Sequence, residues 1–151
     1  ILPLLKNNIP CFIEKPIAIT SNKVEKIIDL INLQKTHIQI GYNRRFYSYI
    51  PEVKEYINNN KIRSVVVNIP EPFDSDDINL GRYLWIQNST HVLDLLKFFF
   101  NDYFIKSKNI SRSNNNFNYD TFNLLLSTNN GFPIHLIANW NTPSNYEIII
   151  N

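Results

Sequence analysis

The sequence predicts an α/β chain of 151 residues, in which a βαβ unit precedes a region of mostly antiparallel strands. Two short apolar runs, 10–14 and 38–40, flank a stretch whose apolar residues recur at helical spacing. Further along, strand-like segments follow one another, and the residues 129–131 (Asn-Asn-Gly) are typical of a hairpin turn. The first pattern indicates a parallel pair of strands, and the second indicates antiparallel neighbours.

The βαβ unit is expected to follow the end of a helix at residues 1–6. Run length makes 10–14 a buried strand, and Cys11 within it is expected to be a buried structural thiol. The next helix begins at Thr20 or Ser21, either of which is a suitable N-cap. Its apolar stripe has the spacing i, i+3, i+4, i+7 and consists of Val24, Ile27, Ile28 and Ile31.

The remainder of the chain is expected to form an α+β region. Its predicted elements are a helix from about Pro51, a strand over 62–69, a helix over 90–100, strands over 103–110, 119–127 and 133–140, and a last strand from about Tyr146. The helix over 90–100 has a buried stripe of Val92, Leu95, Leu96 and Phe99. Loops rich in Pro, Asp, Ser and Asn are expected over 70–82 and 111–116.

Composition excludes several classes of function. A net charge of +2 is too small for a nucleic-acid or membrane-surface protein, and no apolar stretch is long enough for a membrane span. One cysteine allows no internal disulfide and favours a reducing, cytoplasmic compartment. His, Cys, Asp and Glu do not occur at metal-ligand spacing, so no metal is expected.

Two short runs carry the chemistry. Glu14-Lys15-Pro16 follows the first predicted strand, and the run 41–46 (Gly-Tyr-Asn-Arg-Arg-Phe) follows the second, 26 positions after Lys15. Because ligands of open parallel sheets bind at the carboxyl ends of the strands, both runs are expected at one ligand-binding edge. An X-Pro bond has appreciable access to the cis form, so a Lys-Pro at a strand end can aim an ammonium into a cleft.

Together these runs resemble the Gfo/Idh/MocA family of NAD(P)-dependent oxidoreductases. The resemblance implies that Lys15 lies beside the nicotinamide of NAD or NADP and hydrogen-bonds the reacting substrate hydroxyl. It further implies that Glu14, Lys15, Pro16, Asn43 and Arg44 contact the cofactor. The implied reaction is hydride transfer between NAD(P) and a secondary hydroxyl or ketone of a sugar, nucleotide sugar or cyclitol.

The two arginines of the second run have several possible roles. Either Arg44 or Arg45 could pair a phosphate or carboxylate in bidentate fashion. One of them is expected to form a structural ion pair between domains, and the sequence does not say which. The resemblance places Tyr42 and Arg45, together with Lys15, in the substrate pocket.

A third run, 88–94 (Asn-Ser-Thr-His-Val-Leu-Asp), opens the helix predicted over 90–100. The resemblance makes His91 the group that exchanges the substrate proton, and makes Asp94 a residue that places this helix. Many family members have an Asp four residues before this histidine, where this chain has Gln87. An amide can hydrogen-bond a substrate hydroxyl but cannot take its proton, so the chain either relies on Lys15 and His91 alone or belongs to a branch with a different site. The resemblance implies that Lys15 and His91 are catalytic and that Gln87 and His91 bind substrate.

The resemblance also implies a domain organisation. Residues 1–41 would be the C-terminal part of a Rossmann domain, and residues 42–151 a substrate-binding and oligomerisation domain. The chain has no Met and no Gly-rich phosphate loop, and it opens and closes within apolar segments, so it is expected to be a fragment lacking the N-terminal part of the dinucleotide-binding domain. The expected partners are a small sugar-like molecule and further copies of the chain, bound through the open face of the sheet. Gln87 keeps an alternative open, a non-catalytic sugar-binding or regulatory homologue of the same fold.

Overall fold

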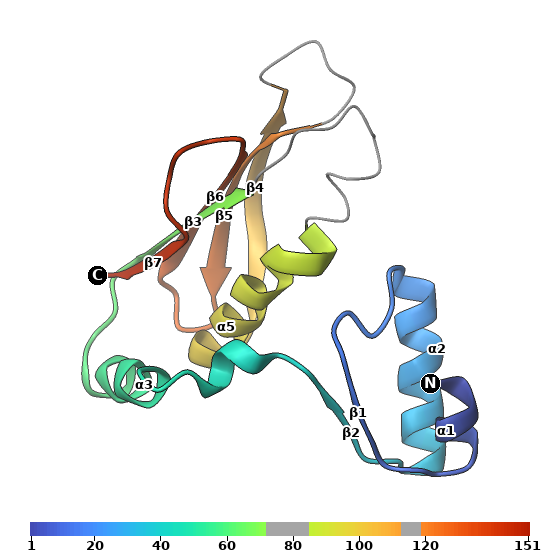
Figure 1. Cartoon of the computed structure of the whole chain (residues 1–151). Coiled ribbons are helices and arrows are strands. Elements are labelled where there is room, and N and C mark those ends of the chain that lie inside the picture. The colour runs from blue at the N-terminus through green and yellow to red at the C-terminus, as the bar shows by residue number, and fades with distance from the viewer. Residues whose placement is uncertain (72–84, 113–118) are drawn as a thin grey trace. The chain divides into compact units, whose positions relative to one another are not determined.

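The computed structural model describes residues 1–71, 85–112 and 119–151 (Figure 1). Most of the predicted loop over 70–82 and of the turn over 111–116 therefore lies outside the described residues. The chain divides into two compact units, which are unit 1 (1–43) and unit 2 (44–151).

Unit 1 is a βαβ arrangement preceded by a short helix. Its elements are α1 (Leu2–Lys6), β1 (Cys11–Ile13), α2 (Ser21–Gln34) and β2 (Ile38–Ile40). The two strands pair in parallel, with Cys11 opposite Ile38 and Ile13 opposite Ile40. The predicted βαβ unit is thus confirmed, and Thr20 is the N-cap residue of α2.

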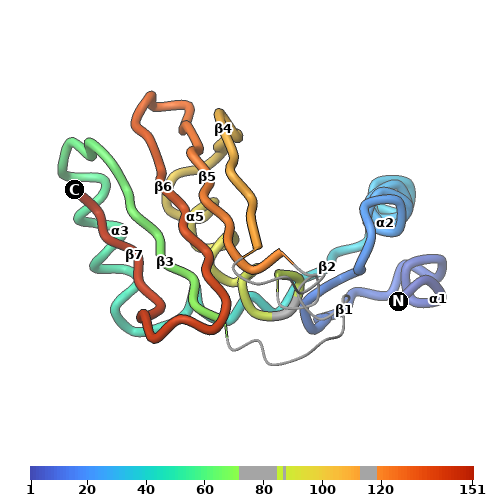
Figure 2. The backbone as a smooth tube through the Cα atoms, turned by 90° about the horizontal axis from the view of Figure 1, so that it is seen from above, coloured from blue at the N-terminus to red at the C-terminus, as the bar shows by residue number. Residues whose placement is uncertain are grey.

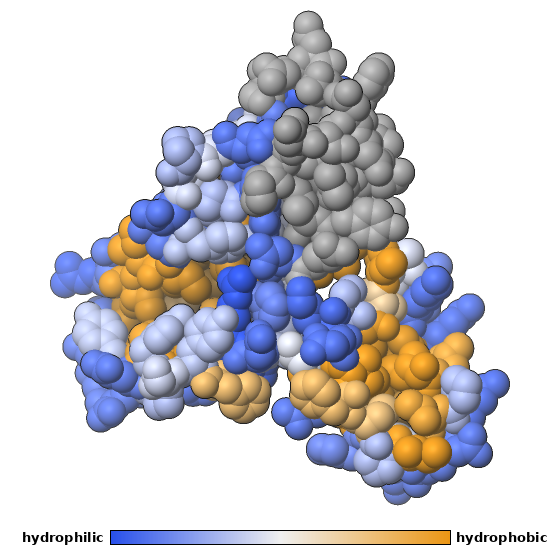
Figure 3. Space-filling model, viewed as in Figure 1, coloured by the Kyte–Doolittle hydropathy of each residue, from blue (hydrophilic) through white to orange (hydrophobic). Residues whose placement is uncertain are grey.

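Unit 1 buries few of its apolar side chains. Leu5 and Ile27 are buried, whereas Ile28 is 48% exposed and Leu33 is 73% exposed. Ile28, a member of the predicted apolar stripe of α2, thus lies on the exposed side of the helix. The predicted burial of the strand over 10–14 is wrong, because Phe12 in β1 is 64% exposed. The predicted burial of Cys11 is also wrong, since β1 has neighbours on one side only and the thiol is partly exposed. Figure 3 shows the resulting hydrophobic surface on this unit.

Unit 2 contains a five-stranded sheet. Its elements are the 3₁₀ turn η1 (Asn43–Phe46, which begins at the last residue of unit 1), α3 (Ile50–Asn59), β3 (Val65–Glu71), the π-turn η2 (Trp85–Ser89), α5 (Thr90–Phe100), β4 (Tyr103–Ser111), β5 (Thr121–Thr128), β6 (Pro133–Trp140) and β7 (Glu147–Ile150). The strand order is β4-β5-β6-β3-β7 (Figure 2).

The core of unit 2 lies on one face of this sheet. Alternate residues of β3 are buried, and α5 lies on the same face with the stripe that the sequence predicts. The side chains with no exposed surface in this core are Val65, Val67, Leu96, Ile134, Leu136 and Ala138. Burying one such aliphatic side chain contributes about 1.5–3 kcal/mol. In the described part of the chain no helix is long and apolar enough to cross a membrane.

The predicted hairpin between β5 and β6 gives the first testable prediction. Gly131 has a φ of +89°, and a Cβ at this position would have no atom within 4 Å. The Gly131→Ala substitution should therefore cost about 1 kcal/mol of unfolding free energy through backbone strain alone. Urea unfolding followed by tryptophan fluorescence measures this loss, because both tryptophans, Trp85 and Trp140, belong to unit 2.

The neighbouring substitution Asn130→Ala is the control, since Asn130 is exposed and its φ is not positive. Its effect should stay within about 0.5 kcal/mol. Equal losses from the two substitutions would contradict the explanation.

Candidate functional site

The segments that follow β1 and β2 lie side by side at the carboxyl edge of unit 1. The amide of Gly41 donates to the carbonyl of Ile13 at 2.8 Å. A Cβ on Gly41 would lie 3.3 Å from Glu14 Oε2 and 3.3 Å from the ring of Phe12. Glycine is thus the residue that lets the two segments approach this closely.

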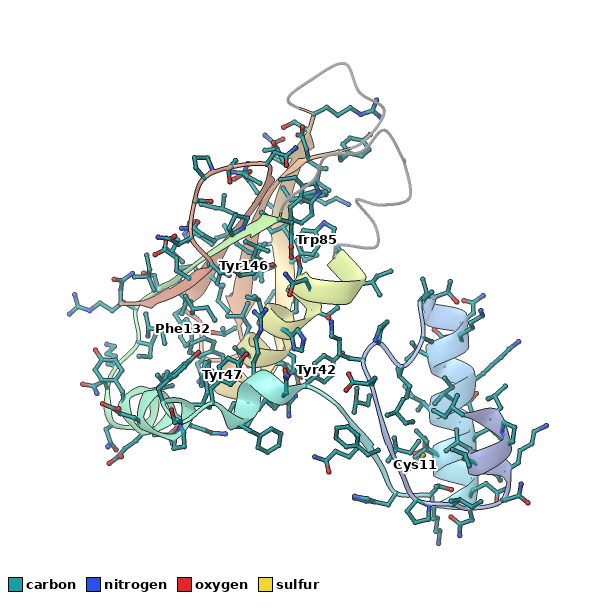
Figure 4. The ribbon with its side chains drawn as sticks, viewed as in Figure 1. Cys11, Tyr42, Tyr47, Trp85, Phe132 and Tyr146 are labelled. Carbon is teal, nitrogen blue, oxygen red and sulfur yellow. The ribbon has the colours of Figure 1, made fainter. Side chains whose placement is uncertain are left out.

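This edge gathers the first set of predicted site residues. Glu14, Lys15 and Pro16 follow β1, and the Lys15–Pro16 peptide bond is cis. Tyr42 and Asn43 follow β2, and Figure 4 labels Tyr42 on this segment. Lys15 and Tyr42 are half-buried, whereas the Glu14 and Asn43 side chains are exposed.

Unit 2 holds the second set, and there the two arginines have different partners. The Arg45 guanidinium pairs with the Asp94 carboxylate through two nitrogens, with Nε 2.6 Å from Oδ2. Asp94 lies on α5 with its side chain largely shielded from solvent, so the predicted structural ion pair belongs to Arg45. Both partners lie within unit 2, so the expectation of a pair between domains is wrong. A role of Arg45 in substrate binding stays a prediction.

Breaking this pair should destabilise unit 2. The Asp94 side chain is only 8% exposed, so the Arg45→Ala substitution leaves a carboxylate desolvated and without its fork of donors. We expect a coupling energy of about 2 kcal/mol from the double-mutant cycle of Arg45→Ala and Asp94→Ala, measured by urea unfolding.

The exposed pair of Lys97 and Asp102 is a matched control. Its N–O distance is 2.9 Å, and its side chains are 67% and 69% exposed. The same cycle on this pair should give less than about 0.5 kcal/mol. Comparable coupling energies in the two cycles would show that the burial of Asp94 does not strengthen its pair.

His91 lies in the first turn of α5 and is buried. The π-turn η2 leads into this helix, and the Thr90 hydroxyl of α5 donates to the Ile86 carbonyl of η2 at 3.0 Å. Gln87 belongs to η2, but its side chain lies outside the described part of the chain. The helix start that the sequence predicts for His91 is confirmed, and its catalytic role stays a prediction.

Arg44 faces η2 and the segment before β7. Its Nη2 donates to Asn88 Oδ1 at 3.0 Å, and its Cζ lies 5.4 Å from the centroid of the Tyr146 ring. Figure 4 labels Tyr146 on the segment that precedes β7. The guanidinium therefore places a positive charge beside Asn88 of η2, and Asn88 precedes His91 by three residues.

A buried carboxylate lies at the end of β3, and sequence reasoning did not identify it. Glu71 is 2% exposed and accepts hydrogen bonds from the Ser89 hydroxyl at 2.9 Å, from Asn88 Nδ2 at 3.0 Å and from the Tyr146 hydroxyl. A signal was present, because the buried alternation of Val65, Val67 and Ile69 continues to Glu71. The predicted strand stopped at residue 69 and so missed it.

Tyr146 donates a hydrogen bond to Glu71. Burial raises the pKa of its hydroxyl well above the ordinary value, and the hydrogen bond to Glu71 raises it further. The phenol is therefore protonated at neutral pH and donates to the carboxylate. The cluster consists of Arg44, Asn88, Glu71, Ser89 and Tyr146, and we call it the Glu71 cluster.

A cavity of about 370 Å³ opens beside this cluster on the surface of unit 2. Arg44, Tyr146 and Glu147 supply polar groups to its wall, and the remainder is tyrosine and apolar. Its other lining residues are Tyr47, Tyr49, Ile50, Val53, Val92, Leu95, Phe99, Ile148 and Ile150. His91 is not part of this wall, so the cavity does not coincide with the predicted proton-exchange group. The described residues contain no group of three or more potential metal ligands.

Comparison with known sequences gives a partial match. No family model matches the chain. Over 92 residues it is 23% identical to an uncharacterized oxidoreductase, YrbE, of Bacillus subtilis, a match that covers 58% of this chain and 27% of that protein.

Solved structures match over nearly the whole chain. A protein of Sinorhizobium meliloti assigned as a myo-inositol dehydrogenase has a TM-score of 0.78 at 17% identity, covering 97% of this chain and 49% of that one. The WlbA dehydrogenase of Chromobacterium violaceum, solved with NADH and UDP-GlcNAcA, has a TM-score of 0.79 at 16% identity, covering 99% and 48%. An oxidoreductase of Agrobacterium radiobacter, solved with NAD+, L-tartaric acid and magnesium, has a TM-score of 0.75 at 17% identity, covering 98% and 48%.

These likenesses establish the fold. The chain spans about half the length of the solved proteins that it matches. The predicted resemblance is thereby confirmed at the level of the fold. The fold class is that of the C-terminal part of a Rossmann domain followed by an α+β domain with a mostly antiparallel sheet.

Proposed function

We propose that this chain, which has the fold of the Gfo/Idh/MocA-type oxidoreductases, forms part of an NAD(P)-dependent dehydrogenase or reductase. Its substrate is a sugar, nucleotide sugar or cyclitol that reacts at a secondary hydroxyl or the matching ketone. Similar proteins solved with NADH and UDP-GlcNAcA, and with NAD+ and L-tartaric acid, support this choice of cofactor and of a polyhydroxylated substrate.

The observation that carries the proposal is the carboxyl edge of β1 and β2. Gly41 there packs against Glu14, so the Lys15 segment and the Tyr42 segment form one continuous rim. Such an edge of parallel strands is where open α/β sheets bind ligands, and the rim offers an ammonium, amide and hydroxyl groups.

This donor set fits a nicotinamide cofactor. Glu14, Lys15, Pro16 and Asn43 at the rim, with Arg44 beyond it in the chain, are the residues that would hold it. When bound, the nicotinamide supplies a two-electron acceptor or donor for hydride. Arg44 offers a fork of donors suited to a phosphate or carboxylate, although one of its nitrogens already binds Asn88.

Lys15 and His91 divide the chemistry at the substrate hydroxyl. The Lys15 ammonium stabilises the negative charge that develops on the oxygen as the hydroxyl is oxidised. The His91 imidazole takes the hydroxyl proton, and returns it to the oxygen in the reverse direction. Tyr42, Arg45 and Gln87 complete the substrate-binding set, with Gln87 supplying an amide in place of a carboxylate.

We further propose that residues 1–41 complete a dinucleotide-binding domain and that 42–151 form the substrate-binding domain. The exposed apolar side chains of unit 1 support this assignment. A unit this small cannot bury them in a core of its own, so they suit packing against the remainder of a dinucleotide-binding domain. The largest exposed fractions among them belong to Leu33, Phe12 and Ile28.

Substitution of the two catalytic residues tests the mechanism. In the protein that contains this chain, Lys15→Ala and His91→Ala should each lower kcat by about 10²–10⁴-fold. Turnover is followed by the absorbance of the reduced nicotinamide with polyols and nucleotide sugars as substrates. The matched controls are Lys23→Ala and His37→Ala, which remove exposed side chains of the same types from unit 1.

Unchanged turnover in the Lys15 and His91 variants would overturn the mechanism. A protein that binds a sugar but never oxidises or reduces the cofactor would instead support the alternative, a non-catalytic sugar-binding or regulatory homologue. Calorimetric titration with the same sugars separates this alternative from a protein that binds none of them.

The face of the sheet opposite α5 supports a homo-oligomer. The strand register places Leu125, His135, Val66 and Ile149 in one row across four strands of this face. In the described part of the chain this face is not packed against a helix, and His135 and Ile149 are exposed. A row with three apolar side chains and one histidine on an uncovered sheet suits pairing with a second copy of the chain.

Charge on this row should separate the copies. The Leu125→Glu substitution would place a carboxylate within the apolar row, which is costly to bury at an interface. We expect light scattering to show monomers for this variant and an oligomer for the unsubstituted protein. Tyr56→Glu, which changes an exposed side chain on α3, is the control and should leave the oligomer intact. A monomeric unsubstituted protein would contradict the proposal.

A further inference from the structure

Among the described residues, the buried carboxylate of Glu71 forms no ion pair. In the described ranges the ion pairs join Arg45 to Asp94 and Lys97 to Asp102, and neither involves Glu71. Burying a carboxylate is costly unless hydrogen bonds replace its hydration. Both of its oxygens accept such bonds, Oε1 from Ser89 and Tyr146 and Oε2 from Asn88.

The donors from η2 are consecutive residues that lead directly into α5. Ser89 is the N-cap residue, and a serine there usually bonds a free amide of the first helical turn. Here the Ser89 side chain makes no capping bond, its backbone is helical (φ −63°, ψ −23°), and its hydroxyl binds Glu71. The helix start is therefore held from outside the helix, by the end of β3.

Asn88 links Arg44 to the same carboxylate through two hydrogen bonds. Its Oδ1 accepts from Arg44 while its Nδ2 donates to Glu71, so the amide lies between a cation and an anion and its orientation is determined. Tyr146 lies between the same two charges, with its ring under the Arg44 guanidinium and its hydroxyl on Glu71.

The π-turn is held at both ends. At its start, Trp85 packs edge-on against Phe122 and Trp140, with ring centroids 5.1 and 5.4 Å away. At its end, Asn88 and Ser89 bind Glu71. A π-turn departs from the hydrogen-bond spacing of the α-helix that follows it, and these side-chain contacts hold η2 where α5 begins.

We propose that Glu71 is a positioning residue for His91, fixing the junction of η2 and α5 through Asn88 and Ser89. His91 follows Ser89 by two residues, in the first turn of the helix that this junction starts. What the imidazole does there rests on the proposed function, whereas its placement is a property of the folded chain.

The Glu71→Gln substitution tests this inference in the 151-residue chain. A glutamine has the same length, but its Nε2 is a donor and would face a donor of the cluster, so at least one hydrogen bond must break. Histidine-ring NMR signals, recorded at one pH and below the unfolding temperature, report the result. We expect the signals of His91 to shift or split, while those of His37 and His135 stay in place.

The chain offers matched controls for this measurement. His37 lies in unit 1, and His135 lies on the uncovered face of the sheet, opposite the face on which Glu71 is buried. Glu147→Gln removes a carboxylate charge from the exposed hydrogen bond that Asn68 donates at 2.6 Å, and should leave all three histidines unchanged.

Two results would overturn the inference. The first is a folded Glu71→Gln variant whose His91 signals match those of the unsubstituted chain, and the second is one in which all three histidines move equally. Should Glu71→Gln fail to fold, Ser89→Ala removes one of the hydrogen bonds and is read in the same way. Unmoved His91 signals in folded Ser89→Ala would then overturn it.

Turnover separates this inference from the proposed function. In an active protein, Glu71→Gln should lower kcat by about 10–100-fold with KM within about twofold, because misplacement of a catalytic group weakens the reaction more than binding. A protein without oxidoreductase activity would overturn the proposed function and leave the NMR result as it stands. Full activity together with unmoved His91 signals would overturn the role of Glu71 alone.

Discussion

Strand β3 is the element on which the order of unit 2 depends. Its buried residues Val65, Val67 and Ile69 form the centre of the core face, with β6 and β7 as neighbours and α5 packed across them. The same alternation brings Glu71 to the buried face at the end of the strand. One periodicity therefore places both the apolar core and the buried carboxylate. The hydrogen bonds of the carboxylate depend on the core, because the core excludes the water that would otherwise solvate it.

The two adjacent arginines illustrate how this arrangement organises charge. Arg45 pairs with Asp94 on α5, while Arg44 points to Asn88 and Tyr146. A 3₁₀ turn sends neighbouring side chains in different directions, so η1 contacts both the body of α5 and the turn that precedes it. The start of α5 is thereby fixed from several sides, which is what the proposed proton exchange at His91 would require.

Unit 1, unlike unit 2, has only a small buried core. Its two parallel strands are short, and its helix leaves much apolar surface exposed, so little of its shape is fixed by burial within the unit. What is well defined is the carboxyl edge, where the Gly41 amide binds the Ile13 carbonyl and the absence of a side chain lets the Glu14 segment approach. The proposed chemistry uses this edge, where backbone geometry and not a large core sets the position of Lys15.

Local sequence patterns were enough to predict the order of the elements and most of their faces, because strand alternation and the 3.6-residue period are local properties. The α5 stripe and the hairpin at Gly131 follow from a few neighbouring residues. The tertiary structure alone decided which arginine pairs with Asp94, that β3 runs parallel to β6, and that Ile28 and Cys11 are not fully buried. It also decided the partners of Glu71, of which Ser89 and Tyr146 lie 18 and 75 residues away in the chain. Such partners are invisible to local periodicity, because hydrogen bonds between distant residues depend on the packing of the whole unit.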